Sequence, residues 1–172
     1  FCTTMLANLG AEVVKLEPPG RGDELRWIGS YPGREGHEDY FNANNYSKKS
    51  IALNLKDPVQ RAVGRALAKK ADVFVENFAP GTARRLGMGW KELHRLNPRL
   101  VYCSISGFGQ SGPYSDRLAM DPVIQAASGV MSVTGSEAGK PLMIGAPLAD
   151  VVSGMFAAYA VLGALHAVRR DG

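Results

Sequence analysis

Asp150 is the carboxylate whose position in this sequence could do chemistry. It follows the segment 145–149, Gly-Ala-Pro-Leu-Ala, and precedes a long apolar stretch predicted as a helix over 151–169. An aspartate at a helix start commonly caps the helix by accepting backbone N–H groups. The same donors favour the carboxylate anion, and carboxylates serve as covalent nucleophiles in enzymes. Position alone favours the capping role and leaves the nucleophilic role open.

The glycine-rich segment 107–112 also invites a chemical interpretation, because it spells GxGxxG after an expected strand. The dinucleotide-binding fingerprint requires a helix whose N-terminus holds the pyrophosphate. Pro113 ends the segment and no long helical pattern follows, so no dinucleotide site is predicted. No metal site is predicted either, because the histidines show no ligand spacing and are expected at the solvated surface: His37, His94 and His166.

The composition is that of an ordinary globular protein, with 172 residues, 45% of them hydrophobic and 21% charged. The net charge of +4 fits an anionic partner such as a phosphorylated small molecule. Lysine and arginine are scattered without a dense run, so a nucleic-acid partner is not predicted. The mild basicity is equally compatible with no charged partner.

The two cysteines, Cys2 and Cys103, are far apart and form no CxxC pair. They predict neither a disulfide framework nor a zinc site, so a reducing compartment is expected, the cytoplasm or, in a eukaryote, the mitochondrial matrix. The longest apolar stretch, Val151–Val168, is interrupted by serine, glycine, tyrosine and histidine. We therefore expect no membrane partner.

Strand-like and helix-like segments alternate along the chain. This alternation predicts an α/β fold, a Rossmann-like parallel sheet flanked by helices. The polar, glycine-rich and aromatic stretch 21–45 is expected to form one long loop. The expected strands are 11–16, 50–55, 72–76 and 99–105, and the expected helices are 2–9, 57–70, 82–86, 90–96, 122–127 and 151–169.

Six further segments share one property: each matches a motif of a single protein family, in the right order. They are LGAEVVKLE (9–17), GRGD (20–23), NYSKKSIALNLK (45–56), ADVFVENFAPG (71–81), SGFGQSGP (106–113) and PLAD (147–150). Each motif alone is modest, but six in order over nearly the whole chain are specific. Together they resemble the class III CoA-transferase family (CaiB/BaiF-like), which also includes the α-methylacyl-CoA racemases.

The resemblance implies a chain of roughly twice this length, folded as two subunits threaded through each other in an interlocked homodimer. Residues 1–172 would be the N-terminal part of its large CoA-binding α/β domain. The family's first strand and its C-terminal half would be missing. Both ends fit such a fragment, because Phe1 is not a methionine and residues 168–172 read as the end of a helix.

The resemblance also implies a reaction. In similar enzymes the aspartate matching Asp150 attacks the acyl-CoA thioester and forms a mixed anhydride, which CoA thiolate converts to an aspartyl-CoA thioester. The acceptor carboxylate then attacks, and a second anhydride passes its acyl group to CoA. Acyl-CoA and a carboxylic acid are the implied substrates, and no tightly bound cofactor is expected.

The resemblance assigns the CoA contacts to residues that follow two of the expected strands. They are Leu53, Asn54, Leu55, Lys56, Asn77, Phe78 and Arg85. A guanidinium at Arg85 suits bidentate pairing with phosphate. Without the resemblance, Lys56 and Arg85 would be read as surface charges and Phe78 as core. Some relatives place a CoA-contacting arginine where this chain has Pro18, so that contact is lost or comes from elsewhere, with Arg21 as one candidate.

Two alternatives to a transferase stay open. The racemase branch carries a histidine where this chain has Met120, beside Asp121, and methionine cannot carry a proton. A transferase is therefore favoured, and Met120 and Asp121 are expected to line the site, with Asp121 capping the helix that follows it. The other alternative is a non-catalytic CoA-binding fragment. The sequence does not identify donor or acceptor, although cations within 21–49 fit the second carboxylate of a dicarboxylate.

Overall fold

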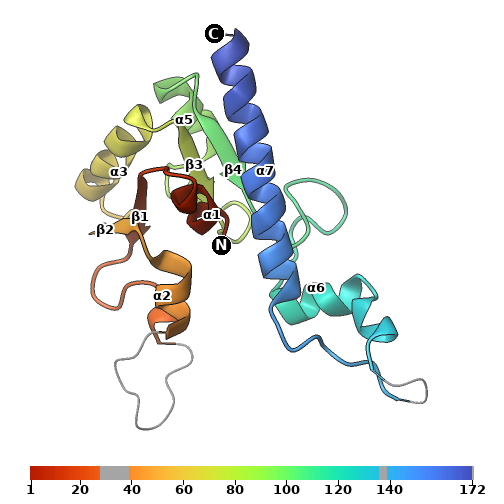
Figure 1. The fold of residues 1–172 in the computed structure, drawn as a ribbon. Helices are drawn as coiled ribbons and strands as arrows, with labels where there is room; N and C mark the ends of the chain where they lie inside the picture. Colours follow the sequence, from red (N-terminus) through yellow and green to blue (C-terminus); the bar gives the residue numbers. More distant parts are fainter. Residues whose placement is uncertain (28–38, 136–138, 172) are drawn as a thin grey trace.

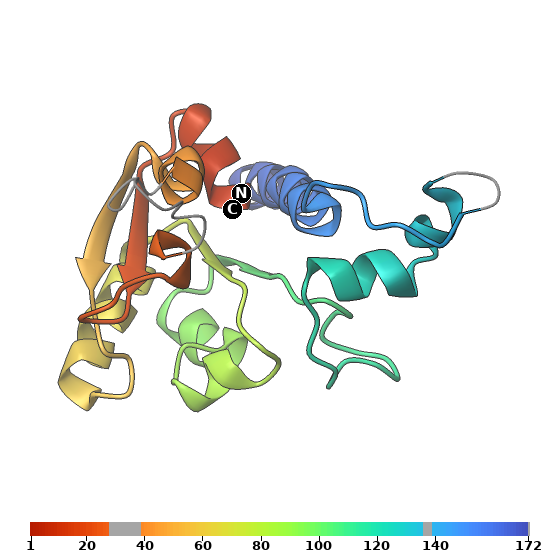
Figure 2. The same ribbon diagram turned by 90° about the horizontal axis from the view of Figure 1, so that it is seen from below.

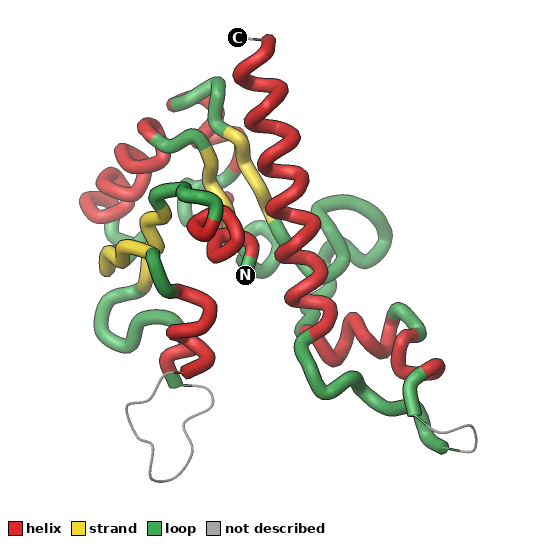
Figure 3. The backbone as a smooth tube through the Cα atoms, in the orientation of Figure 1, coloured by secondary structure: helices red, strands yellow, loops and turns green. Residues whose placement is uncertain are grey.

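The computed structural model describes residues 1–27, 39–135 and 139–171 of the chain. Its strands form two parallel pairs, β1 with β2 and β3 with β4, rather than one continuous sheet (Figures 1 and 3). The strands are β1 (Val13–Glu17), β2 (Lys48–Ala52), β3 (Val73–Glu76) and β4 (Val101–Ser104). The expected parallel α/β arrangement is confirmed, and the ladder of β2 begins two residues earlier than the sequence pattern predicts.

Helices connect and cover the strands. The α-helices are α1 (Cys2–Asn8), α2 (Asp39–Asn45), α3 (Pro58–Lys70), α4 (Thr82–Arg85), α5 (Trp90–Leu96), α6 (Asp121–Ala127) and α7 (Leu148–Asp171), and the 3-10 turns are η1 (Glu24–Arg26) and η2 (Val130–Val133). The start of α3 follows from its sequence, since Asp57 Oδ1 accepts 2.9 Å hydrogen bonds from the N–H groups of Val59 and Gln60. Pro58 suits the first turn, where its missing N–H costs nothing.

The core has two parts, one on each face of the β3–β4 pair. Val73 and Val75 of β3 pack toward the buried residues of α1 and α7, whereas Phe74 packs toward the cluster under α3 and α5. This alternation is the two-residue period of a strand with both faces covered. The first cluster is Cys2, Leu6, Ala158 and Val161, and the second is Ala68, Met88, Leu93 and Leu100.

The prediction of one long loop over 21–45 is wrong in its described parts. Residues 24–26 form η1 and residues 39–45 form α2, while 28–38 lie outside the described residues. Phe41 explains the difference, because its ring is 7% exposed and lies 3.8 Å beneath the guanidinium carbon of Arg26. Tertiary packing thus orders a segment whose local composition favours a loop.

The direction of α7 decides where its first residues lie. Arg99, just before β4, donates a 3.3 Å hydrogen bond to the carbonyl of Val168, near the end of α7. Helix and strand therefore run in opposite directions, and α7 begins on the side where β4 ends. By the rise of a helix and of a strand, Asp150 lies roughly 10 Å beyond the end of β4. Seen from below, α6 lies beside this first part of α7 (Figure 2).

The long helix α7 exposes a large apolar face. By length and composition alone it is long and apolar enough to cross a membrane, a test that core helices of globular proteins also pass. One face packs against α1 and β4, and Gly154 permits this contact, because a Cβ there would lie 3.0 Å from the backbone nitrogen of Cys2. The other face is open, with Phe156 70% and Tyr159 68% exposed. A partly packed helix of this kind fits a protein core that is continued by further chain.

Candidate active site

Asp150 lies inside the first turn of α7, not at its cap. The helix begins at Leu148, and the N–H of Val151 donates a 3.0 Å hydrogen bond to the carbonyl of Pro147. Asp150 is therefore the third helical residue, and it does not hold the capping role that its position alone had favoured. Pro147 was the available signal for an earlier start, because proline is frequent at the first turn of helices.

Asp121 of α6 takes over the capping role. Its Oδ1 accepts hydrogen bonds from the backbone nitrogens of Ala149 at 2.7 Å and of Asp150 at 3.3 Å. The carboxylate is only 8% exposed. The expectation that Asp121 caps its own helix is wrong, because Asp121 is the first residue of α6 and the N-cap position is held by Met120, which makes no side-chain cap hydrogen bond. Asp121, expected to line the site, is thus brought into direct contact with the backbone of Asp150.

This arrangement leaves the carboxylate of Asp150 free. Within the described ranges it accepts no hydrogen bond, and the residue as a whole is exposed. Partial burial of the carboxyl group, followed by the charge of Asp121, raises the pKa of Asp150 above its ordinary value. A more basic carboxylate with unengaged lone pairs is a better nucleophile, and the N-terminus of α7 still favours its anion.

Gln125 is the site residue that the sequence analysis missed. Its amide is 1% exposed and uses both ends: Nε2 donates to Asp121 Oδ2 at 2.6 Å and to the carbonyl of Ala146 at 3.2 Å. Its Oε1 accepts from the backbone nitrogen of Ile144 at 2.9 Å. These contacts join α6 to the segment that enters α7. No local pattern announces them, because two of the partners lie 19 and 21 residues away.

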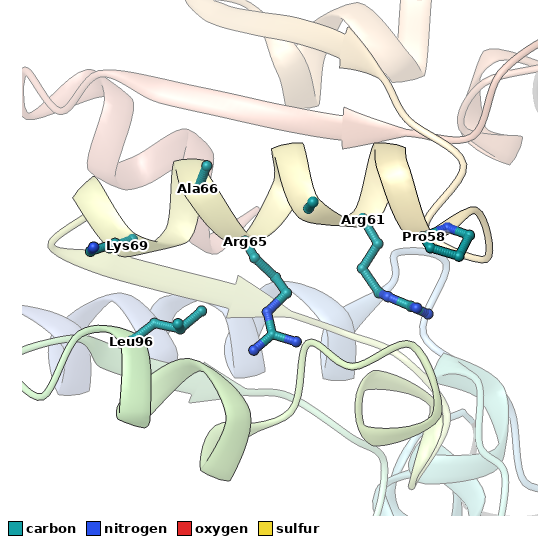
Figure 4. A pocket seen from close by; sticks show the side chains of 7 residues that line it. Pro58, Arg61, Arg65, Ala66, Lys69 and Leu96 are labelled. Carbon is teal, nitrogen blue, oxygen red and sulfur yellow. The ribbon is translucent and has the colours of Figure 1, made fainter.

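Six of the predicted CoA contacts follow the carboxyl ends of β2 and β3, and the seventh, Arg85, lies in α4. Leu53 directly follows β2 and donates its N–H to the carbonyl of Glu17 at 2.8 Å, while Asn77 and Phe78 directly follow β3. In Figure 4, β1 and β3 point toward the same end of α3, the end at Pro58. The two groups therefore share one edge, where ligands of open α/β sheets gather.

The side chains at this edge differ in burial. Leu53 is buried at 8% and Leu55 packs against the second core cluster, so both support the loop. Phe78 is 38% exposed, which excludes it from the core. Its N–H donates to Glu76 Oε2 at 2.8 Å, which fixes the turn after β3. The exposed polar groups of this edge are Asn54, Lys56, Asn77 and Arg85.

Three of these polar groups are already oriented by the chain, and Asn77 Nδ2 donates to the carbonyl of Ile105 at 3.3 Å. Asn54 Oδ1 accepts from the N–H of Lys56 at 3.1 Å, which shapes the turn before α3. Arg85 Nη2 donates to Thr82 Oγ1 at 2.6 Å. In the part of the chain that is described, no hydrogen bond or ion pair connects this edge to Asp150. Met120 is 76% exposed next to Asp121. The predicted site is thus split into a strand-end edge and a carboxylate at the start of α7.

A basic groove lies elsewhere, between α3 and α5. Arg61, Arg65 and Lys69 line it along one face of α3, opposite Leu96 (Figure 4). None of the predicted site residues lines it. We therefore do not include this groove in the candidate site.

The histidines play no evident part in the site. His166 is exposed as expected, and His37 lies outside the described residues. The surface expectation is wrong for His94, which stacks on Trp90 with ring centroids 4.2 Å apart and buries its Nδ1 without a partner in the described structure. Across residues 1–27, 39–135 and 139–171, no three His, Cys, Asp or Glu side chains are grouped to hold a metal ion.

Known proteins with similar sequences include CoA-transferases. The model of CoA-transferase family III matches residues 1–172. The chain is 46% identical to an acetyl-CoA:oxalate CoA-transferase of Acetobacter aceti, over 100% of this chain and 44% of that protein. It is 42% identical to a succinyl-CoA:glutarate CoA-transferase of Mus musculus, over 100% of this chain and 39% of that protein.

The solved structures agree. A CaiB/BaiF family protein from Brucella suis superposes with a TM-score of 0.93 at 37% identity, covering 99% of this chain and 46% of that one. The chain thus spans less than half the length of these relatives. The match over the whole chain, in sequence and in fold, shows that the chain belongs to CoA-transferase family III.

Proposed function

We propose that the full-length protein transfers coenzyme A from an acyl-CoA donor to a carboxylic acid, with Asp150 as the covalent nucleophile. One observation carries the proposal: Asp121 satisfies the first N–H groups of α7, so the carboxylate of Asp150 stands free at the helix N-terminus. An aspartate whose role was to cap the helix would itself accept backbone N–H groups of the first turn.

The reaction has four acyl-transfer steps, and the Asp150 carboxylate takes part in each of them. Asp150 attacks the thioester carbonyl carbon, the C–S bond breaks, and CoA leaves as the thiolate. The thiolate attacks the Asp150 carbonyl of the mixed anhydride and releases the donor acid as its carboxylate. The acceptor carboxylate then displaces CoA thiolate from the aspartyl thioester. Thiolate finally attacks the acceptor's acyl carbon, which yields the new acyl-CoA and restores Asp150. The acyl groups stay activated throughout, so no further energy source is consumed.

CoA is proposed to lie along the strand-end edge and to reach toward α7. Lys56 and Arg85 are exposed cations there, suited to phosphate groups, and Asn77 and Phe78 offer an amide and an aromatic face. The separation of this edge from Asp150 fits a long ligand with its charged part at one end and its reactive thioester at the other. CoA enters as part of the substrate, and no tightly bound cofactor is proposed.

For the acid substrate we propose a dicarboxylate. The relatives described above are named for oxalate and for glutarate. A second carboxylate needs a cation, and Arg21 is exposed at the strand-end side of β1, with its guanidinium carbon 5.1 Å from the ring of Trp27. A panel of oxalate, succinate, glutarate and acetate as acceptors tests the class. Equal rates with acetate would contradict it.

A homodimer is proposed as the working assembly, with the rest of the chain and a second copy covering α7. The open face of α7 supports this, since it exposes large apolar side chains: Val152, Met155, Phe156, Tyr159 and Leu162. The thiols of Cys2 and Cys103 are free, which fits a reducing compartment such as the cytoplasm or the mitochondrial matrix.

Trapping the covalent intermediate tests the proposal. The full-length enzyme is incubated with acyl-CoA, quenched with hydroxylamine or borohydride, and digested for mass spectrometry. We expect modification at Asp150, absent in Asp150→Asn and retained in Asp116→Asn, a matched control at an exposed loop position. Transfer that survives in Asp150→Asn would contradict the mechanism. Exchange of the substrate's α-hydrogen with solvent deuterium, without transfer, would favour the racemase alternative.

A further inference from the structure

Gln125 is a buried polar side chain whose cost of burial calls for an explanation. It is 1% exposed, and a leucine of similar size would fill the same space without desolvating an amide. Its two Nε2 hydrogen bonds and one Oε1 hydrogen bond all reach one place, the start of α7 and the carboxylate that caps it. A fully satisfied buried network of this kind fixes one geometry.

We propose that Gln125 is a positioning residue for Asp150, acting through Asp121 and through the segment 144–146. The inference rests on the proposed nucleophilic role of Asp150. The 2.6 Å bond from Nε2 to Asp121 Oδ2 sets the rotation of that carboxylate, so that Oδ1 faces the N–H groups of Ala149 and Asp150. The bonds to Ile144 and Ala146 hold the segment that enters α7 against α6.

The physical consequence is a competition between two carboxylates for one helix end. If Asp121 loses its donor, it can rotate away and leave the first N–H groups of α7 without an acceptor. Asp150, in the first turn, is then the nearest carboxylate able to accept them. A carboxylate that accepts such bonds is less basic and a poorer nucleophile. Gln125 thus keeps the nucleophile from becoming a cap.

The test uses Gln125→Leu in the full-length enzyme, with Ser128→Ala as control, because Ser128 is exposed on the same helix end and its hydroxyl donates to the backbone carbonyl of Gln125 at 3.2 Å. We expect the rate of aspartyl labelling per folded enzyme to fall about 10- to 100-fold. The KM for acyl-CoA should stay within about two-fold, because the strand-end contacts are intact. The acid limb of the pH–rate profile should move to lower pH. Ser128→Ala should match the unchanged enzyme.

A merely structural Gln125 gives a different result. Gln125→Leu would then lower Tm while the labelling rate per folded enzyme and the acid limb stay unchanged, and this outcome overturns the inference. If Gln125→Leu does not fold, Gln125→Glu replaces it, since it keeps the size and the acceptor for Ile144. Its rate relative to the unchanged enzyme should rise as pH falls, because only a protonated Glu can donate to Asp121. A pH-independent ratio overturns the inference.

Asp150→Asn run in parallel separates this inference from the proposed function. Activity in Asp150→Asn would refute the nucleophile, and the positioning role with it. An inactive Asp150→Asn beside a Gln125→Leu enzyme with unchanged rate and pH profile would refute only the positioning role.

Discussion

Glu17 and Asp150 are two carboxylates of one chain with opposite surroundings. Glu17 closes β1, is 4% exposed, and accepts hydrogen bonds from Arg26 Nε at 2.9 Å, Ser50 Oγ at 2.6 Å and the N–H of Asp23 at 2.9 Å. The Arg26 guanidinium in particular lowers the pKa of Glu17 to about 2. Asp150 is exposed, and its pKa is raised by partial burial and by Asp121.

The difference shows that surroundings, not residue type, separate a structural carboxylate from a reactive one. The lone pairs of Glu17 are engaged by donors that tie β1 to β2 and η1, so its anion is stable and unreactive. Asp121 accepts the hydrogen bonds of the backbone N–H groups nearest to Asp150. The Asp150 carboxylate is therefore more basic, and its lone pairs accept no hydrogen bond within the described residues. One carboxylate should therefore govern stability and the other the rate.

The largest expected effect is on the rate. Asp150→Asn in the full-length enzyme should lower kcat for CoA transfer at least about 10³-fold, because an amide cannot form the anhydride. Tm should stay unchanged or rise slightly, since a carboxylate with a raised pKa opposes folding once it is ionised. Steady-state transfer and thermal unfolding of the same preparation check both. A large loss of Tm would instead assign Asp150 a structural role.

Glu17→Gln should show the reverse pattern. It removes the charge of the buried Glu17 carboxylate from its ion pair with Arg26, at a cost of about 3 kcal/mol in unfolding free energy. The rate per folded enzyme should change little. Urea unfolding checks this, with Glu12→Gln as the matched control, because Glu12 pairs with Lys49 in full exposure and its loss should not be measurable. Equal effects of the two variants would contradict the comparison.

The acid dependence of stability sharpens the same contrast. The pKa of Glu17 lies near 2 in the folded chain, below its ordinary 4.5. The unfolded chain therefore binds the proton more tightly, and the stabilisation present above pH 4.5 is lost as pH falls toward 2. In Glu17→Gln, stability should decline less steeply across this window. Urea midpoints measured from pH 5 to pH 2 check it, and identical slopes would contradict it.

Gly107, in the glycine-rich loop after β4, packs closely against Ala119, in the segment before α6. A Cβ at this position would lie 2.3 Å from the Cβ of Ala119, closer than atoms can approach. Gly107→Ala should therefore cost about 1–3 kcal/mol and displace the segment that carries Met120 and Asp121. Tm and the rate of aspartyl labelling check it, and both should fall. An unchanged Tm would show that the loop moves freely.

Local patterns predicted most of the fold. Short, mainly apolar runs give β3 and β4, and Asp57 with Pro58 gives the start of α3. The start of α7 was placed three residues late, because Asp150 is a stronger local cap signal than Pro147. The helix α2 was missed because it depends on the packing of Phe41 under Arg26, a contact between residues 15 apart.

The site was predictable only in part, for the same reason. Asp150 and the residues after β2 and β3 were identified because they lie in sequence segments that match motifs of the family. The identity of the α7 cap is not local: Asp121 is 28 residues from Ala149, and Gln125 joins it only in three dimensions. A buried glutamine on a short helix carries no pattern that separates it from an exposed one.

The smallest expected effect concerns the charge of Asp121. Asp121→Asn keeps Oδ1 as acceptor for Ala149 but removes the negative charge that helps to raise the pKa of Asp150. The acid limb of the pH–rate profile should therefore move to lower pH in this variant. The new amide faces the Nε2 donor of Gln125, so the rate should fall as well, and only the position of the limb is diagnostic. Asp116→Asn, a charge change in an exposed loop, should leave the limb in place. An acid limb that does not move in Asp121→Asn would contradict a contribution of the Asp121 charge to the raised pKa of Asp150. Burial alone would then raise this pKa, and Asp121 would serve only as the cap of α7.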